Sequence, residues 1–424
     1  MIKYFSVENF RSIKTENILE FDSNLEKNSG FVPNPVIGFA GANASGKTTI
    51  LQALSFTLWF MKNSFLQLEE NEKIPVEPFC TLKKSPTKFH LIFSKPTLVE
   101  GQHKAVDYEY ELCLTEDKVL TETLYYSPYR KGSSRKVYFR NGNKVELGAT
   151  ISRFETKDLR ANCSIVSYAS QFASQKVAIA CKHYGFYSNV HPTEGLQEDK
   201  YDDSLILKDM LQDEETRYKI QEFLKVADVG IEDVYVRDTI EEFLRDIEET
   251  MDEERKKSFN LQKRNEIKAR LISNELELGG FVFKALFKHK IDNSLVEFSD
   301  DLESHGTLKF LTVLYRVLNA LRDGTLLIFD EIELKLHQNL VAYLIGLFEN
   351  ELENKNGAQL IFSFHNTALM EILKPAQLWF AEKNDEGHTE LFSAADFEDI
   401  KPLEKKNLET LYRIGRFGAK PRGI

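Results

Sequence analysis

A short glycine-rich segment has the residue types and the spacing that phosphate binding requires. Gly41 and Gly46 enclose four residues and are followed by Lys47 and Thr48, which matches the template G-x-x-x-x-G-K-[ST] in full. Glycine lets such a loop turn its backbone N–H groups towards an anion without steric cost. In this template the lysine reaches the β- and γ-phosphates of a nucleotide, and the threonine hydroxyl binds Mg²⁺. An ordinary glycine-rich turn, or a degenerate loop that binds nothing, is the alternative.

Two acidic residues after a short apolar run could supply the metal ligand and the base that such a loop lacks. Residues 326–329 have the composition of a central parallel strand, and Asp330 and Glu331 follow directly. Ligands bind at the carboxyl ends of the strands in open α/β sheets. Asp330 is therefore expected to hold Mg²⁺ through water, and Glu331 to polarise the attacking water. A strand that ends in two solvated acids is the alternative.

A histidine stands at the end of a further apolar run. His365 follows the apolar strand expected over 359–364, which comes after the acidic pair and a crossover helix expected over 340–352. An imidazole at that strand end can bond the γ-phosphate and report its presence. A purely structural histidine is the alternative, and the order of the elements favours the phosphate role.

A Ser-x-Gly-Thr turn opens a long amphipathic helix whose apolar residues extend over 308–318. The free N–H groups of a helix N-terminus attract anions. Since the loop at Lys47 already serves one phosphate group, this second terminus suggests a site shared between two copies of the chain. Ser304 and Gly306 of one copy would then cover the γ-phosphate held by Lys47 of the other. A plain capped helix is the alternative.

The elements around the loop are those that a phosphate site needs. Residues 34–41 are predicted to form a buried strand, and the apolar positions after Lys47 predict a helix, so a helix N-terminus is aimed at the bound anion. Composition divides the chain into three parts, 1–195, 196–280 and 281–424. The first part begins with strands and the glycine loop and continues with further strand-like runs, which we expect to be antiparallel. The middle part is charged and helical in pattern, and the last part alternates strands with helices. We therefore expect an α/β fold with a helical insertion.

Composition bounds the function. The chain has 424 residues, of which 42% are hydrophobic, and a net charge of −11, which disfavours nucleic-acid binding over the whole surface. The four cysteines are far apart and form no C-x-x-C pair, so neither a cysteine zinc site nor a disulfide framework is indicated. The first residues alternate like a strand and lack a signal-peptide core, and no apolar run approaches the roughly 20 residues of a membrane span. We expect a cytoplasmic protein without membrane contact.

One local patch remains open to nucleic acid. Residues 128–144 include six basic residues and no acid, with three aromatic residues interleaved. Lysine and arginine contacts to phosphates would suit such a segment to nucleic acid. A solvated β-hairpin with a Gly-Ser-Ser turn fits it equally well.

Taken in order, these segments resemble a known superfamily. The runs are "NFRSI" (9–13), "GANASGKTT" (41–49), "ESHGT" (303–307), "FDEIELKLH" (329–337) and "FSFHNT" (362–367). They resemble the ABC-type ATPases of the SMC, RecF and overcoming-lysogenization-defect group. The ending "LYRIGRFGAKPRGI" (411–424) is more similar to the stand-alone phage-defence ATPases of the AbiLi or RloA type, which often carry the AAA label.

The resemblance implies an ABC-ATPase head, a P-loop NTPase with a mixed β-sheet lobe and a short helical insertion, in which two heads sandwich two ATP molecules. It implies that Glu331, Lys47 and His365 are catalytic and that Thr48 and Asp330 bind Mg²⁺. The segment 333–337 takes the D-loop position. The implied ATP-binding residues are Arg11, Gly41, Ala42, Asn43, Ala44, Ser45, Gly46, Lys47, Thr48, Thr49, Gln171 as a weak match to the Q-loop, Ser304 and Gly306.

Departures from the family pattern narrow the function. The signature reads "ESHGT" and not "LSGGQ", which argues against a transporter subunit. The helical stretch 239–272 has sparse apolar positions, so a surface helical lid is favoured over a coiled coil. Since no acidic nuclease domain follows His365, the resemblance implies a defence ATPase that controls a separate effector, such as a TOPRIM-like nuclease. The basic tail is either a docking element for it or a segment folded back on the head.

Two other functions stay open at this point. A RecF-like ATPase that clamps DNA during repair or recombination is favoured by the basic patch and disfavoured by the low isoelectric point. The second open function is that of a scaffold that binds ATP without hydrolysing it.

Overall fold

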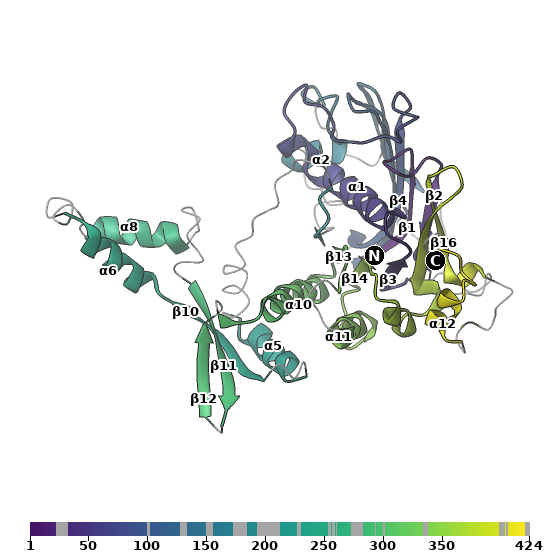
Figure 1. Ribbon diagram of the computed structural model, residues 1–424. Coiled ribbons are helices and arrows are strands. Elements are labelled where there is room, and N and C mark those ends of the chain that lie inside the picture. Colours follow the sequence, from purple (N-terminus) through teal and green to yellow (C-terminus); the bar gives the residue numbers. More distant parts are fainter. Residues whose placement is uncertain are drawn as a thin grey trace. The chain divides into compact units, whose positions relative to one another are not determined.

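The computed structural model describes most of the chain, which forms two compact units (Figure 1). The first unit comprises Met1–Leu196, Ala320–Leu334 and Val341–Ile424, and the second comprises Gln197–Asn319 and Lys335–Leu340. The described residues are 1–22, 33–99, 102–127, 134–149, 156–172, 185–192, 213–226, 230–252, 256, 259, 261–272, 283–292, 294–299, 302–333, 338–397, 403 and 406–419.

A six-stranded sheet in the first unit contains the predicted strands. Its order is β16 (Thr389–Ser393), β15 (Leu378–Lys383), β3 (Val36–Ala40), β14 (Gln359–Ser363), β13 (Leu326–Phe329) and β9 (Phe186–Ser188). All neighbours are parallel except β15 and β16. Every residue of β3, β13 and β14 is buried, as expected for central strands covered on both faces. The sheet, with helix α1 (Lys47–Gln67) following β3, confirms the α/β class and the strand–loop–helix order.

A seven-stranded antiparallel sheet forms the other half of this unit. Its order is β2 (Asn17–Glu20), β1 (Ile2–Glu8), β4 (Thr87–Val99), β5 (Gln102–Leu114), β6 (Val119–Ser127), β7 (Arg135–Asn141) and β8 (Lys144–Leu147). One face is apolar: Phe5, Phe89 and Leu112 belong to the same buried core as Phe56 of α1. That core also includes Ile328 and Ile361 of the parallel sheet, which explains why α1 is apolar almost all round.

The C-terminal segment folds back on the first unit. Helix α12 (Leu408–Arg413) follows α11 (Gln338–Glu349) and the β15–β16 hairpin along the chain. The rings of Tyr412 and Phe417 stack on Phe380 of β15, with centroids 5.7 and 5.0 Å away. The Tyr412 hydroxyl donates to the Ala419 carbonyl at 3.0 Å. These contacts favour the folded-back alternative for residues 406–419, while Lys420 and Arg422 lie outside the described residues.

The second unit is built on a three-stranded antiparallel sheet. Strand β11 (Phe283–Ile291) pairs with β10 (Ile231–Asp238) on one side and β12 (Ser294–Ser299) on the other. Its described residues include the helices α5 (Glu214–Val226), α6 (Ile240–Thr250), α8 (Leu261–Ile272) and most of α10 (His305–Asp323). Strand β10 lies in a part of the sequence that we expected to be helical, and this expectation is wrong. The strand forms because it pairs with β11, about 50 residues further along the chain, and this tertiary pairing overrides the local pattern.

The described residues of the helical stretch expected over 239–272 include the two helices α6 and α8. Figure 1 shows α6 and α8 side by side, and Ile240, Leu244 and Leu271 form a small core there. Arg264 and Lys268 of α8 both pair with Glu241 of α6, at 2.8 and 2.7 Å. The few apolar residues of this stretch therefore pack between α6 and α8. The domain boundaries at 195 and 280 stay a prediction.

Within the described part of the chain, no helix combines the length and apolar character needed to cross a membrane.

Candidate functional site

The glycine loop lies between β3 and α1, and its backbone requires glycine at both template positions. Gly41 and Gly46 have φ angles of +142° and +111°. A Cβ atom on Gly41 would lie 2.3 Å from the Ala381 carbonyl oxygen, and one on Gly46 would lie 2.2 Å from the Thr389 hydroxyl. Strands β15 and β16 therefore press against the back of the loop and leave room only for glycine.

Substituting Gly46 with alanine is expected to distort the loop and weaken ATP binding by more than about tenfold, because a left-handed backbone and a clash with Thr389 coincide there. Titration with a fluorescent ATP analogue measures the affinity. The matched control is Gly346→Ala in α11, where an added Cβ meets no atom within 4 Å. Unchanged affinity in Gly46→Ala would show that the loop does not need this backbone shape.

Hydroxyl groups tie the loop to its surroundings. The Thr389 hydroxyl donates to the Ser45 carbonyl at 2.9 Å and lies 2.8 Å from the Ser12 hydroxyl. Ser12 in turn donates to Thr49 in the first turn of α1 at 3.1 Å. Two segments far apart in the sequence, those of Ser12 and Thr389, thus hold the loop and the start of α1, and local sequence patterns gave no sign of Thr389.

The predicted phosphate-binding lysine is buried in the loop. Lys47 is 5% exposed, and its ammonium donates to the carbonyls of Gly41 and Ala42 at 2.8 and 3.0 Å. Burial lowers the pKa of Lys47, while the negative charges of Asp330, Glu331 and Glu333 act in the opposite direction. The ammonium is therefore held by loop carbonyls and lies within the electrostatic influence of the three acidic residues.

The two oxygen groups predicted to bind Mg²⁺ lie next to each other. The Thr48 hydroxyl donates to the Asp330 carboxylate at 2.7 Å, although the two residues are 282 positions apart. Ser363 donates to the other Asp330 oxygen, and Asn189 bonds both the N–H and the C=O of Asp330, at 2.7 and 3.0 Å. Hydroxyl and carboxylate oxygens are the hard ligands that Mg²⁺ prefers, so this donor set fits the ion.

Ser363 and Asn189 were not singled out by sequence reasoning. Ser363 is the serine before Phe364 in the strand-end run, and Asn189 follows β9, which the sequence did not predict as a neighbour of β13.

The predicted base and the predicted phosphate sensor also meet. Nε2 of His365 lies 3.1 Å from the Glu331 carboxylate. Glu331 has a φ of +52°, a backbone conformation that residues other than glycine rarely adopt. Its backbone N–H donates to the Ser363 hydroxyl at 2.8 Å, which supports this turn. Strain of this kind is typical of functional positions, because the surrounding structure must hold the residue there.

Glu333 fixes the start of the segment after His365. Its carboxylate accepts from the backbone N–H groups of His365 and of Asn366, the latter at 3.1 Å. Of the predicted D-loop position, Glu333 is described, and 334–337 lie outside the described residues.

Two other predicted ATP ligands have hydrogen-bond partners outside this group. The Arg11 guanidinium donates to Gln52 at 2.5 Å and pairs with Glu77 at 3.1 Å. Gln171 is exposed near the end of α2 (Ile165–Phe172), where its amide donates to the Ser170 hydroxyl. Their predicted contacts with ATP stay predictions.

Ser304 belongs to the second unit, where its hydroxyl accepts from the Thr307 N–H at 3.0 Å and so caps α10. Gly306 lies in the first turn of the same helix. This geometry is what the capped-helix alternative requires, and the contact across two copies stays a prediction.

The structure leaves fewer basic residues of the patch 128–144 accessible to nucleic acid. Arg140 is fully buried, and its guanidinium donates to the carbonyls of Cys163, Arg160 and Gly142. Lys136 pairs with Glu146 at 3.0 Å. Arg130 and Lys131 lie outside the described residues. Arg140 is therefore a structural residue, because a nucleic acid could not reach it.

Comparisons with known proteins agree with this geometry at the level of family. The model of the family described as "AAA domain, putative AbiEii toxin, Type IV TA system" matches residues 36–371. No curated protein matches the chain.

Solved structures that are similar to this chain include SMC heads. The SMC head domain from Thermotoga maritima is 13% identical, with 92% of this chain and 98% of that chain covered and a TM-score of 0.41. An SMC head bound to the C-terminal winged-helix domain of ScpA is 13% identical, with 92% of this chain and 97% of that chain covered and a TM-score of 0.43. The SMC head of Pyrococcus furiosus with an extended coiled coil, bound to the C-terminal domain of ScpA, is 12% identical. The match covers 98% of each chain, and its TM-score is 0.41.

Proposed function

This chain belongs to the AAA-domain family whose model matches it over residues 36–371, and on that premise we propose that it is a magnesium-dependent ATP hydrolase. The observation that supports the reaction is the cluster made by three segments that are distant in the sequence. Thr48 lies against Asp330 at 2.7 Å, and Glu331 lies against His365 at 3.1 Å.

Each residue of the cluster has a role that its position supports. Lys47 holds the phosphates from within the loop, and Thr48 and Asp330 hold Mg²⁺, which when bound neutralises phosphate charge. Glu331 orients water and takes up its proton, and His365, within hydrogen-bond distance of Glu331, contacts the γ-phosphate. Catalysis in such a site comes from positioning and charge stabilisation, as is general for phosphoryl transfer.

We propose further that hydrolysis controls a separate effector in bacterial defence against phage, with two copies of the chain sandwiching ATP. The family description names a toxin of a toxin–antitoxin system, which fits a chain that acts together with a second protein. A TOPRIM-like nuclease is the kind of effector that the sequence resemblance implies. The described part of the tail packs on Phe380 of β15.

Phage infection of cells that express the chain with the proteins encoded beside it tests this role. Wild type is expected to reduce plaque formation, and Glu331→Gln to lose the protection. Glu351→Gln, an exposed carboxylate after α11, is the control and should protect like wild type. Replication genes beside this one, with equal plaque numbers for all three proteins, would reject the defence role and leave the ATPase proposal standing.

The DNA-clamp alternative has lost part of its support, since Arg140 is buried and Lys136 is paired. A DNA shift assay at low and high salt with ATP present decides it. Salt-dependent binding would restore that alternative.

A further inference from the structure

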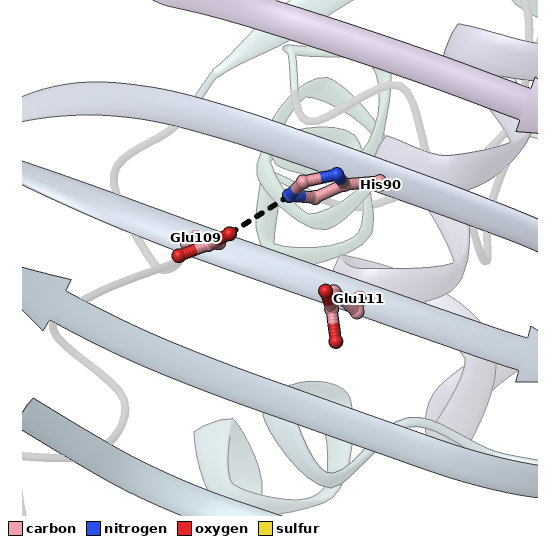
Figure 2. Close-up of side chains that lie close together, drawn as sticks. All are labelled: His90, Glu109 and Glu111. Atoms are coloured by element: carbon pink, nitrogen blue, oxygen red, sulfur yellow. Dashed lines mark hydrogen bonds and ion pairs between the residues drawn. The ribbon is translucent and has the colours of Figure 1, made fainter. Parts of the chain in front are cut away.

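Three potential metal ligands lie together on the outer face of the antiparallel sheet, in the unit that also contains the glycine loop. Figure 2 shows His90 on β4 and Glu109 and Glu111 on β5. His90 is directly opposite Glu111 in the register of the two strands, and Glu109 lies two residues along on the same face. No part of the proposed ATPase reaction uses them.

The distances suit one cation. Nε2 of His90 lies 3.0 Å from a Glu109 oxygen, and one ligand atom from each of the three residues lies within 4.8 Å of the others. Ligands about 2.0–2.2 Å from one Zn²⁺ lie roughly 3–4 Å from one another, so small rotations of the carboxylates suffice. We propose that His90, Glu109 and Glu111 form a binding site for a borderline divalent cation of the Zn²⁺ class.

The electrostatics of the face favour such an ion. Glu109 and Glu111 place two carboxylates side by side on one strand, and neighbouring like charges on a sheet face are unfavourable. A single histidine does not balance both, whereas a divalent cation does. An ordinary surface His–Glu pair uses only Glu109, whereas a bound cation would use Glu111 as well.

Neighbouring side chains hold two of the ligands. The Thr123 hydroxyl of β6 donates to the Glu111 carboxylate at 3.2 Å, and Thr123 itself is buried. The Tyr4 ring of β1 packs against the His90 imidazole with centroids 5.0 Å apart. Partners of this kind orient metal ligands and strengthen binding.

The donor set separates this site from the Thr48–Asp330 pair. An imidazole nitrogen suits Zn²⁺ and similar first-row cations, whereas the hydroxyl and carboxylate oxygens of the other site suit Mg²⁺. Three protein ligands leave one tetrahedral position for water on the exposed side. A bound cation would join β4 to β5 and stabilise the folded sheet by mass action.

Direct titration of the full chain tests the proposal. The protein carries Asp330→Asn, which removes the other expected metal site, and is treated with a chelator and kept free of nucleotide. Co²⁺ absorption and competition of Zn²⁺ with a chromophoric chelator measure binding. One cation per chain is expected, with affinity at least about 100-fold lower in His90→Gln and in Glu111→Gln, and about tenfold lower in Thr123→Val.

Two control variants exclude other ligands. Cys113→Ser, on the same face of β5, and Glu146→Gln, on β8, should both bind like the parent. Circular dichroism confirms that each variant is folded, and exposed Glu111 decides the matter if His90→Gln does not fold. Absence of stoichiometric binding in the parent, or undiminished binding in Glu111→Gln, would overturn the proposal.

Discussion

Glu331→Gln is expected to lower ATP hydrolysis by about 100- to 10,000-fold while ATP binding persists, because the substitution removes the proton acceptor and little else. Glutamine has the same shape and can still bond His365, which lies 3.1 Å from the carboxylate. Lys47, Thr48 and the loop backbone, which hold the phosphates, are unchanged. Phosphate release under saturating ATP and Mg²⁺ measures turnover, and a fluorescent ATP analogue measures binding.

The control for this experiment is Glu351→Gln, which changes the same charge at an exposed turn of the same unit. It should hydrolyse ATP like wild type. If wild type releases no more phosphate than Glu331→Gln, the chain is a scaffold that binds ATP without turnover, and the enzyme proposal is wrong.

Arg140→Met is expected to reduce the free energy of unfolding of the first unit by about 3–5 kcal/mol. Arg140 and Glu122 are both fully buried, with Nη1 of Arg140 3.6 Å from the carboxylate. Glu122 also accepts from Tyr138 at 2.9 Å and Ser164 at 2.6 Å. Without the guanidinium, Glu122 remains as a buried charge, and three backbone carbonyls lose their donor.

Urea unfolding followed by tryptophan fluorescence measures this loss. Both tryptophans, Trp59 and Trp379, belong to the first unit, so the signal reports that unit. Adding Glu122→Gln to Arg140→Met should recover part of the stability, because it removes the unpaired charge. Lys136→Met, which breaks an exposed pair, should cost less than about 1 kcal/mol. An equal loss in Lys136→Met and Arg140→Met would show that burial does not set the cost.

The sequence alone named the five residues that the structure brings together: Lys47, Thr48, Asp330, Glu331 and His365. It could do so because their signals are local. A glycine loop has a fixed spacing, and a polar residue directly after an apolar strand lies at the carboxyl edge of a parallel sheet, wherever that strand stands in the chain. The order of strands was not needed for that inference.

Contacts set by strand order and register were beyond the sequence. Asn189 reaches Asp330 only because β9 pairs with β13. Thr389 of β16 reaches the loop only because β16 pairs with β15 and β15 pairs with β3. From the sequence, Arg140 was predicted to belong to a basic surface patch. Its position on β7 directs its side chain into the core instead.

What the sequence determined by itself is therefore the kind of fold, the phosphate loop and the residues at strand ends, since each follows from short-range spacing. Tertiary structure decided which distant residues support them, and also placed His90 opposite Glu111. The physical reason is that backbone pairing joins segments hundreds of residues apart, and a shift of one residue in register would turn every side chain of a strand to the other face.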